Sequence, residues 1–262
     1  MKLSIITVNL NNVDGLKKTV DSVMSQTWRD FEWIIVDGGS TDGSKELIEE
    51  LASNPQSNIS WWCSEKDQGI YNAMNKGIGK ATSDYSLFLN SGDYLFANDV
   101  LLKVQQSDIE ADIIYGDAEM ICLDGTSYTK IMPDVVSVDF FFRDTIIHQS
   151  TFVKNTVFLE FPYDECLRVA SDRKLWFQCL LAEKSFAHLP FRVCSFDLSG
   201  IGTIGNMKEE EKVIIDELFP KAVQKSIREL ADYKYTFPQL SRLISQIKHR
   251  RLYKRLVLRL LF

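Results

Sequence analysis

The first 117 residues of this chain predict an α/β fold built on a doubly wound, mostly parallel sheet. Short apolar runs rich in β-branched and aromatic residues predict strands over residues 3–8, 31–36, 59–63, 85–89 and 113–115. Stretches with helical spacing of apolar residues lie between these runs and predict helices over residues 16–24, 44–51, 71–78 and 98–104. Strands that alternate with helices form parallel sheets. In such sheets, ligands bind beyond the carboxyl ends of the strands.

A less regular half follows over residues 118–205. Leu123-Asp124-Gly125-Thr126 predicts a hairpin turn. Residues 170–181 predict a helix whose N-terminus is capped by Ser171. We therefore expect strands and helices of mixed direction in this half.

Beyond residue 205 the pattern changes to charged, helical segments that break at Pro220 and Pro238. We expect a main domain over residues 1–205, whose halves meet at residue 117. A helical extension over residues 206–262 would complete the chain.

The composition is that of an ordinary globular protein, with 45% hydrophobic and 25% charged residues among 262. We find neither a signal-peptide pattern nor an uncharged apolar stretch of about 20 residues that could span a membrane. The five cysteines are scattered and never paired as CxxC, which predicts reduced thiols. These features predict a cytoplasmic protein.

The charge is distributed unevenly along the chain. No acidic residue follows Asp232, whereas eight of the 30 basic residues do. The acidic body argues against nucleic acid as a partner, and the basic tail predicts contact with an anionic surface. A basic stripe at helical spacing lies beside an apolar face in this tail and consists of Lys248, Arg251, Arg255 and Arg259. Such a helix suits the inner surface of the plasma membrane, and packing against the main domain or a dimer partner is the alternative.

Polar side chains stand where the predicted strands end. The first strand ends at Thr7 and Asn9, and the second runs into Asp37 and the sequence GGSTDGS. A carboxylate at such a place accepts hydrogen bonds from a nucleotide base or a ribose hydroxyl. Glycines beside it let the backbone approach the ligand.

The next two strand ends carry similar side chains. Residues 64–77 crowd Asp67, Lys76 and other polar side chains around a short helix, which is more than helix capping requires. The fourth strand ends at Asn90-Ser91-Gly92-Asp93, where a carboxylate on a glycine turn is suited to Mg²⁺ or Mn²⁺. Such a cation would bind one or two carboxylates and the phosphates of a substrate.

Six segments in this order closely resemble glycosyltransferase family 2, whose members have the nucleotide-sugar-binding GT-A fold. They are the first strand with Asn9, VDGGSTDGS (36–44), SEKDQGIYNAMNKG (64–77), FLNSGD (88–93), HQSTF (148–152) and ASDRKLWFQ (170–178). The resemblance covers roughly residues 1–200 and is greatest to bacterial members that build colanic-acid-type surface polysaccharides. It implies an inverting hexosyltransferase that moves a sugar from a nucleoside-diphosphate sugar to a hydroxyl of a saccharide acceptor, which such enzymes commonly find on a lipid.

The resemblance also implies a role for individual residues. Asp172 would be the catalytic base, and Asp93 would bind the metal. Asp37 would contact the nucleotide base, and Asp67 and Lys76 would lie near the ribose and diphosphate. The full set that binds the nucleotide sugar would be Thr7, Asn9, Asp37, Asp67, Lys76 and Asn90.

One departure concerns the metal site, because Asn-Ser-Gly-Asp stands where many relatives have three acids. His148 is a candidate additional metal ligand, and holding backbone or phosphate is its alternative role. Asp172 also has an alternative role, as a negative charge at a helix N-terminus that contributes ~0.3–1 kcal/mol. Glu165 would then be the other candidate base. We expect Asp117 to contact residues of the site without contacting the substrate.

Two other functions remain open from the sequence. A sugar nucleotidyltransferase would use a similar sheet, but it needs a basic, glycine-rich loop after the first strand, and residues 9–15 contain no Lys or Arg. A catalytically inactive scaffold that binds nucleotide sugars is the other alternative. The presence of both Asp93 and Asp172 argues against it.

Overall fold

A computed structural model describes residues 1–198 and 207–236, and the strands of these residues form one mixed sheet. The order across the sheet is β3 (Ile59–Ser64), β2 (Phe31–Asp37), β1 (Leu3–Asn9), β4 (Tyr85–Phe88), β8 (Thr151–Lys154), β6 (Ile113–Ile121), β9 (Phe186–Asp197) and β5 (Tyr94–Leu95). The short strand β7 (Ser127–Lys130) pairs with β6 beside this path. The predicted α/β fold is confirmed.

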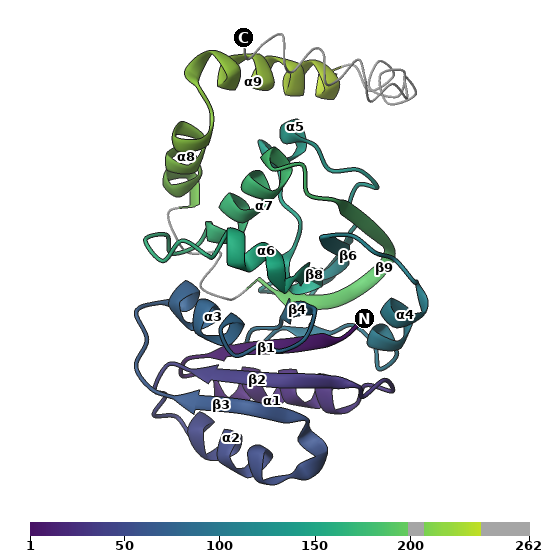
Figure 1. Ribbon diagram of the computed structural model, residues 1–262, viewed down its shortest axis with the longest axis vertical. Helices are drawn as coiled ribbons and strands as arrows, with labels where there is room; N and C mark the ends of the chain where they lie inside the picture. The colour runs from purple at the N-terminus through teal and green to yellow at the C-terminus, as the bar shows by residue number, and fades with distance from the viewer. Residues whose placement is uncertain (199–206, 237–262) are drawn as a thin grey trace.

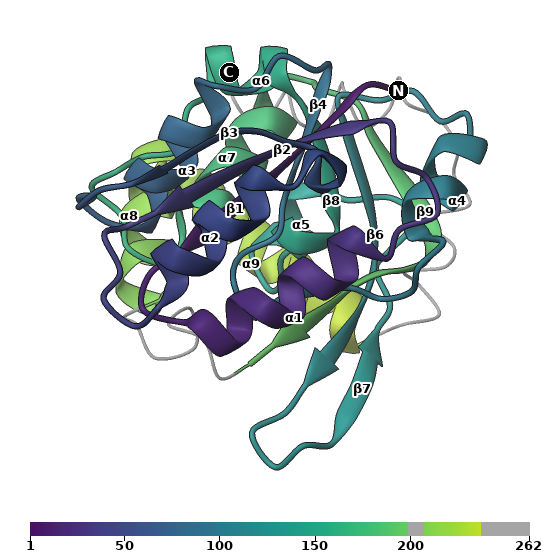
Figure 2. The ribbon, with the colours of Figure 1, turned by 90° about the horizontal axis from the view of Figure 1, so that it is seen from below.

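The nucleotide-side half of the sheet is parallel. Strands β3, β2, β1 and β4 run side by side in the same direction. Helices α1 (Val13–Met24) and α2 (Ser44–Ser53) cover one face, and α3 (Ile70–Ile78) covers the other (Figures 1 and 2). Helix α3 lies so close to β1 that a Cβ on Gly77 would come within 2.5 Å of the Ile6 side chain. The parallel direction brings the ends of β1, β2 and β3 to one edge of the sheet.

The second half is mixed, as predicted, but it begins earlier than the sequence indicates. Strand β8 inserts antiparallel between β4 and β6, and β9 then pairs parallel with β6. The fifth predicted strand, at residues 113–115, is therefore the start of β6 and does not join the parallel half. The predicted turn at residues 123–126 links β6 to β7, and Gly125 has a φ of +81° there. This hairpin projects from the body (Figure 2).

Helices cover the second half and continue into the C-terminal extension (Figure 1). They are α4 (Val100–Gln106), α5 (Val138–Phe141), α6 (Asn155–Glu160), α7 (Ser171–Leu181), α8 (Met207–Leu218) and α9 (Lys221–Thr236), with the 3-10 turn η2 (His148–Ser150). Another 3-10 turn, η1 (Pro55–Ser57), precedes β3 in the nucleotide-side half. Pro220 separates α8 from α9, as predicted. Phe219 beside it packs edge-on against Phe142 and Phe177, with ring centroids 5.3 Å apart in both pairs. The extension therefore packs on the second half.

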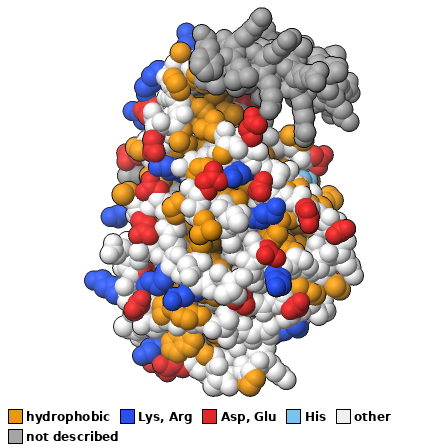
Figure 3. Space-filling model, in the orientation of Figure 1, with side chains coloured by type: hydrophobic (Ala, Val, Ile, Leu, Met, Phe, Trp, Pro, Cys, Tyr) orange, Lys and Arg blue, Asp and Glu red, His pale blue; other side chains and the backbone are white. Residues whose placement is uncertain are grey.

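The surface in the orientation of Figure 1 carries interspersed acidic and basic side chains, and hydrophobic side chains gather in its upper part (Figure 3). Within the described ranges, none of the helices has the length and apolar character needed to cross a bilayer. The basic stripe from Lys248 to Arg259 lies outside the described residues.

Candidate active site

Asp37 ends β2, is fully buried and accepts four hydrogen bonds from the protein. Its Oδ1 accepts from Asn9 Nδ2 at 2.7 Å and from the Ser40 hydroxyl at 2.5 Å. Its Oδ2 accepts from the Ser40 backbone N–H at 2.9 Å and from the Ser64 hydroxyl at 2.6 Å. Burial raises the pKa of Asp37, but the hydrogen bonds from Ser40, Ser64 and Asn9 outweigh burial and lower the pKa overall. The carboxylate thus ties the ends of β1, β2 and β3 together.

The two polar residues at the end of β1 differ in what their side chains contact. Thr7 is fully buried, and its hydroxyl accepts a hydrogen bond from Trp33 Nε1 at 3.0 Å inside the core. The Oδ1 of Asn9 is buried and has no hydrogen-bond partner among the described residues. Because an unpaired buried acceptor is costly, Asn9 offers an oxygen that a ligand N–H or O–H could satisfy.

Asp67 and Lys76 lie beside the Asp37 network. A Cβ on Gly38 would come within 2.6 Å of Asp67 Oδ2, so this carboxylate lies directly over the turn that follows Asp37. Lys76 Nζ pairs with Glu65 Oε1 at 2.7 Å, and this hydrogen bond raises the pKa of Lys76. The structure therefore brings together most of the residues predicted to bind a nucleotide sugar.

The loop after β4 is held next to the end of β1. The Ser91 backbone N–H donates to the Val8 carbonyl at 3.0 Å, and Asn12 Nδ2 donates to the Ser91 carbonyl at 2.9 Å. These contacts place the turn that carries Asp93 along the same edge of the sheet as Asp37.

Asp93 is a buried carboxylate on a turn where Gly92 has a φ of +105°. Its Oδ2 accepts a hydrogen bond from Gln149 Nε2 at 2.9 Å, and its Oδ1 accepts one from the Asp197 backbone N–H at 3.2 Å. Burial raises the pKa of Asp93 to about 7, and the charge of Asp197 acts in the same direction. The two hydrogen bonds and His148 lower this pKa but do not offset burial. The surroundings of Asp93 therefore do not offset the cost of burying its charge.

This environment fits a divalent cation. Each oxygen of Asp93 accepts one hydrogen bond and keeps a lone pair, and Asp197 brings a second carboxylate nearby. In residues 1–198 and 207–236, no three His, Cys, Asp or Glu side chains are grouped closely enough to hold a metal by themselves. Mg²⁺ and Mn²⁺ favour oxygen ligands and are commonly held by one or two carboxylates and substrate phosphates. A cation here would need the phosphates of a bound substrate.

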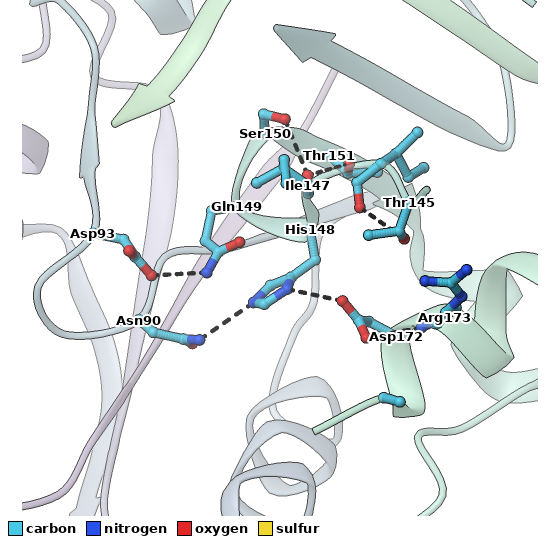
Figure 4. Close-up of polar contacts among 12 residues, drawn as sticks. Asn90, Asp93, Thr145, Ile147, His148, Gln149, Ser150, Thr151, Asp172 and Arg173 are labelled. Atoms are coloured by element: carbon cyan, nitrogen blue, oxygen red, sulfur yellow. Dashed lines mark hydrogen bonds and ion pairs between the residues drawn. The ribbon is translucent and has the colours of Figure 1, made fainter. Parts of the chain in front are cut away.

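His148 lies between Asn90 and Asp172, as Figure 4 shows. Its Nε2 is 3.2 Å from Asn90 Nδ2, and its Nδ1 is 3.2 Å from Asp172 Oδ2. A neutral ring protonated at Nδ1 satisfies both contacts, because it donates to Asp172 and accepts from Asn90. Both nitrogens are then occupied, so this geometry does not favour His148 as a metal ligand. His148 instead contacts the side chain of Asp172, a role that differs both from metal ligand and from the alternative of holding backbone or phosphate.

Asp172 lies in the first turn of α7, as predicted. Its Oδ1 accepts a hydrogen bond from the Arg173 backbone N–H at 2.8 Å, and its Oδ2 faces His148. The aromatic residues Tyr71 and Tyr163 lie nearby: burial raises the pKa of both phenols, and the charge of Asp172 adds to this effect. The carboxylate is thus oriented through both of its oxygens.

The predicted cap of this helix is wrong. Ala170 is the N-cap residue, and it makes no side-chain capping bond. The Ser171 hydroxyl, the predicted cap, instead accepts from the Asp164 backbone N–H at 2.6 Å. Tyr71 of α3 lies near this helix start, and the backbone of Ser171 and Asp172 acts against burial on the pKa of its phenol. A residue of the nucleotide-side half therefore lies beside the helix that carries Asp172.

Glu165 and Asp117 have different partners from Asp172. Glu165 accepts hydrogen bonds from Asn72 Nδ2 at 2.8 Å and from Asn75 Nδ2 at 2.9 Å, so both of its oxygens are bound to α3. Asp117 contacts His188 Nε2 at 3.0 Å. These contacts give Glu165 and Asp117 roles in linking elements of the fold.

The sequence did not single out Gln149, Asp197 or Tyr71. Gln149 follows His148 in the chain, and these neighbours contact the two predicted carboxylates, Asp93 and Asp172, respectively (Figure 4). The only available signal was their place in the segments HQSTF and SEKDQGIYNAMNKG. The sequence contains no signal for Asp197, because this residue is 104 residues from Asp93 and is brought next to it by β9, which ends at Asp197.

Comparison with known proteins bears on what this site does. The family model "Glycosyl transferase family 2" matches residues 4–158. A PGL/p-HBAD biosynthesis glycosyltransferase of Mycobacterium tuberculosis is 33% identical over 181 residues, which cover 67% of this chain and 68% of that protein. The chain belongs to glycosyltransferase family 2. This membership leaves the sugar nucleotidyltransferase alternative without support.

Solved structures share the fold of this family 2 chain. S. aureus TarS 1–349 in complex with UDP-GlcNAc gives a TM-score of 0.68 at 16% identity, covering 90% of this chain and 73% of that chain. In the complex of TarS 1–349 with UDP, the matched part of this chain spans 60% of that structure. The mannosyltransferase PcManGT from Pyrobaculum calidifontis, in complex with GDP-Man and Mn²⁺, gives a TM-score of 0.55 at 15% identity, with coverage of 74% and 56%.

The expected resemblance to colanic-acid enzymes is not specifically supported. Similar proteins include mycobacterial glycosyltransferases of PGL/p-HBAD biosynthesis, so these comparisons show the family but do not show which polysaccharide the chain would build.

Proposed function

We propose that this family 2 glycosyltransferase is inverting and metal-dependent, and that it transfers a hexosyl group from a nucleoside-diphosphate sugar to an acceptor hydroxyl. One observation supports this most directly. The adjacent residues His148 and Gln149 contact Asp172 and Asp93, respectively. These two contacts hold Asp172, the proposed base, and Asp93, the proposed metal ligand, in one site.

In this mechanism Asp172 removes the proton from the acceptor hydroxyl. The acceptor oxygen forms a bond to C1 of the sugar, while the C1–O bond to the diphosphate breaks and its electrons leave with the diphosphate. Attack from the opposite face inverts the anomeric carbon. The Nδ1–H of His148 keeps the carboxylate of Asp172 oriented, and general-base help of this kind contributes about 10²–10⁴-fold to the rate.

Asp93, with Asp197 close by, would hold the cation together with the donor diphosphate. When bound, Mn²⁺ or Mg²⁺ neutralises the charge that develops on the leaving group. The Mn²⁺ present with GDP-Man in PcManGT supports this assignment. The raised pKa of Asp93 supports it independently, since a cation would satisfy this buried carboxylate.

The donor would lie along the edge formed by β1, β2 and β4. Asn9 offers an unpaired oxygen, Asp67 lies over the turn after Asp37, and Lys76 brings a positive charge. Asp37 would act on the nucleotide base mainly by holding these strand ends in place, because its oxygens are occupied. Thr7 would support the site through the core.

The acceptor is proposed to be a saccharide or glycoside attached to a lipid. The similar mycobacterial proteins are named for PGL/p-HBAD biosynthesis, which supports a role in making glycoconjugates. The basic, amphipathic residues 248–262 would then bring the enzyme to the anionic inner surface of the plasma membrane.

A donor screen tests the proposed activity. UDP-N-acetylglucosamine, UDP-glucose and GDP-mannose are incubated with the protein and Mn²⁺, and release of nucleoside diphosphate is measured with and without excess EDTA. We expect release from at least one donor and its loss in EDTA. Full activity in EDTA would contradict the metal assignment, and binding of these donors without release of product would favour the inactive scaffold.

Co-sedimentation tests the membrane proposal. A chain truncated after Thr236 should no longer bind vesicles that contain anionic phospholipid, whereas its release of nucleoside diphosphate with water as acceptor should stay within about twofold, because the described site is complete without the tail. Vesicle binding that is insensitive to both the truncation and added salt would contradict the proposal.

A further inference from the structure

The loop just before α7 is bound to a single carboxylate of the C-terminal extension. Glu210 Oε1 accepts a hydrogen bond from the Arg168 backbone N–H at 2.8 Å. Its Oε2 accepts from the backbone N–H groups of Val169 and Ala170, both at 3.0 Å. Three successive N–H groups therefore converge on one side chain, which lies 40 residues away in the chain. Hydrogen bonds to a charged acceptor are roughly twice as strong as neutral ones.

The helix that carries Glu210 is itself fixed to α7. Glu211 pairs with the buried guanidinium of Arg173 at 2.7 Å, and Glu217 pairs with Lys174 at 2.8 Å. Ile214 and Ile215 of α8 are buried in the core. Because these contacts hold α8 along α7, the carboxylate of Glu210 has a defined position relative to the start of α7.

The start of α7 determines where Asp172 lies. Ala170 is the N-cap and makes no side-chain capping bond of its own, and its N–H group is bound by Glu210. Asp172 follows Ala170 by two residues, and its contact with His148 is 3.2 Å long. A shift of about 1 Å in this turn would take that contact beyond hydrogen-bond range.

We propose that Glu210 is a positioning residue for the catalytic base, and that the C-terminal extension is thereby part of the active-site architecture. This inference rests on the proposed role of Asp172. Glu210 does not act on substrate. It fixes the first turn of α7, so that Asp172 meets both His148 and the acceptor hydroxyl.

The test uses Glu210→Gln in the full chain, with Glu229→Gln as a matched control. The control makes the same change on α9, at an exposed carboxylate that pairs with Lys225. In Glu210→Gln the amide keeps one acceptor oxygen but turns an NH₂ group toward a backbone N–H. Glu210→Asp keeps the charge and serves as a second variant if the glutamine variant does not fold.

The first readout is the ¹⁵N NMR signal of His148 Nδ1, assigned with His148→Gln, which needs no donor. We expect Glu210→Gln to change this signal in the same direction as Asp172→Asn does, and Glu210→Asp to change it less. Glu229→Gln should leave it unchanged. An unchanged His148 signal in a folded Glu210 variant would overturn the proposal, because the start of α7 would then not depend on this carboxylate.

The second readout is steady-state release of nucleoside diphosphate from the donor that is active in the screen. Glu210→Gln should lower kcat about 10-fold or more and leave the donor KM within twofold. In an Asp172→Asn background the same change should have almost no further effect on kcat. An equal loss in both backgrounds would overturn the positioning role. If Asp172 is not the catalytic base, the single variant Asp172→Asn will itself keep full activity, which distinguishes this failure from a failure of the positioning role.

Discussion

Asp37 and Asp93 are both buried carboxylates, which follow β2 and β4 on either side of β1, yet their surroundings are opposite. Asp37 accepts four hydrogen bonds, and these lower its pKa despite burial. Asp93 accepts two and has a second carboxylate nearby, and its pKa is raised to about 7. A carboxylate satisfied by the protein organises the fold, whereas one left unsatisfied is suited to bind a cation. Both residues belong to the nucleotide-side half, so the opposite pKa shifts come from the partners that each carboxylate has.

The largest effect is expected at Asp172, in the second half of the sheet domain. Asp172→Asn keeps the shape of the side chain but removes the proton acceptor, so kcat should fall about 10²–10⁴-fold while donor KM changes little. Glu165→Gln is the matched control, because Glu165 is bound to Asn72 and Asn75 and should keep near-normal kcat. A larger loss in Glu165→Gln than in Asp172→Asn would exchange their roles.

Asp93→Asn should stabilise the protein without metal at alkaline pH. Because the folded-state pKa is raised, the folded protein binds more protons than the unfolded chain between pH 3.8 and about 7, and its stability falls as the pH rises through this window. The full shift corresponds to at most ~4 kcal/mol above pH 7. Urea unfolding with EDTA should therefore show a gain for Asp93→Asn at pH 8 and almost none at pH 4. A loss of stability in Asp93→Asn at pH 8 would contradict the claim that the buried charge of Asp93 destabilises the fold without metal.

Asp37→Asn should act in the opposite direction and destabilise the protein. At pH 7 the loss is about 2–3 kcal/mol, because hydrogen bonds to a charged acceptor are weakened and an NH₂ group faces the donors of Ser40 and Ser64. The folded pKa of Asp37 is lowered, so its contribution is present above the unfolded value near 4 and is lost as the pH falls below it. The same urea series at pH 3, 5 and 7 checks this. A variant as stable as wild type at pH 7 would contradict the account of Asp37.

The parallel half could be predicted from sequence because its strands and helices alternate in short, local units. Each strand end carried its own signal, from Asn9 to Asp93. The second half could not be predicted in the same way. The strand at residues 113–115 pairs with β8 and β9, which come later in the chain, and the N-cap residue of α7 is hydrogen-bonded to Glu210 of α8. Ser171 was a reasonable local cap, but tertiary contacts gave its hydroxyl another partner.

The most direct test compares nucleotide binding in Asp93→Asn and Asp172→Asn. Isothermal titration calorimetry with UDP and with GDP, in Mn²⁺ and in EDTA, measures how much the cation adds to affinity. We expect Mn²⁺ to strengthen binding to wild type and to Asp172→Asn equally, and Asp93→Asn to lose this gain. If Asp93→Asn kept the Mn²⁺-dependent gain while Asp172→Asn lost it, the division of roles between the two carboxylates would be contradicted.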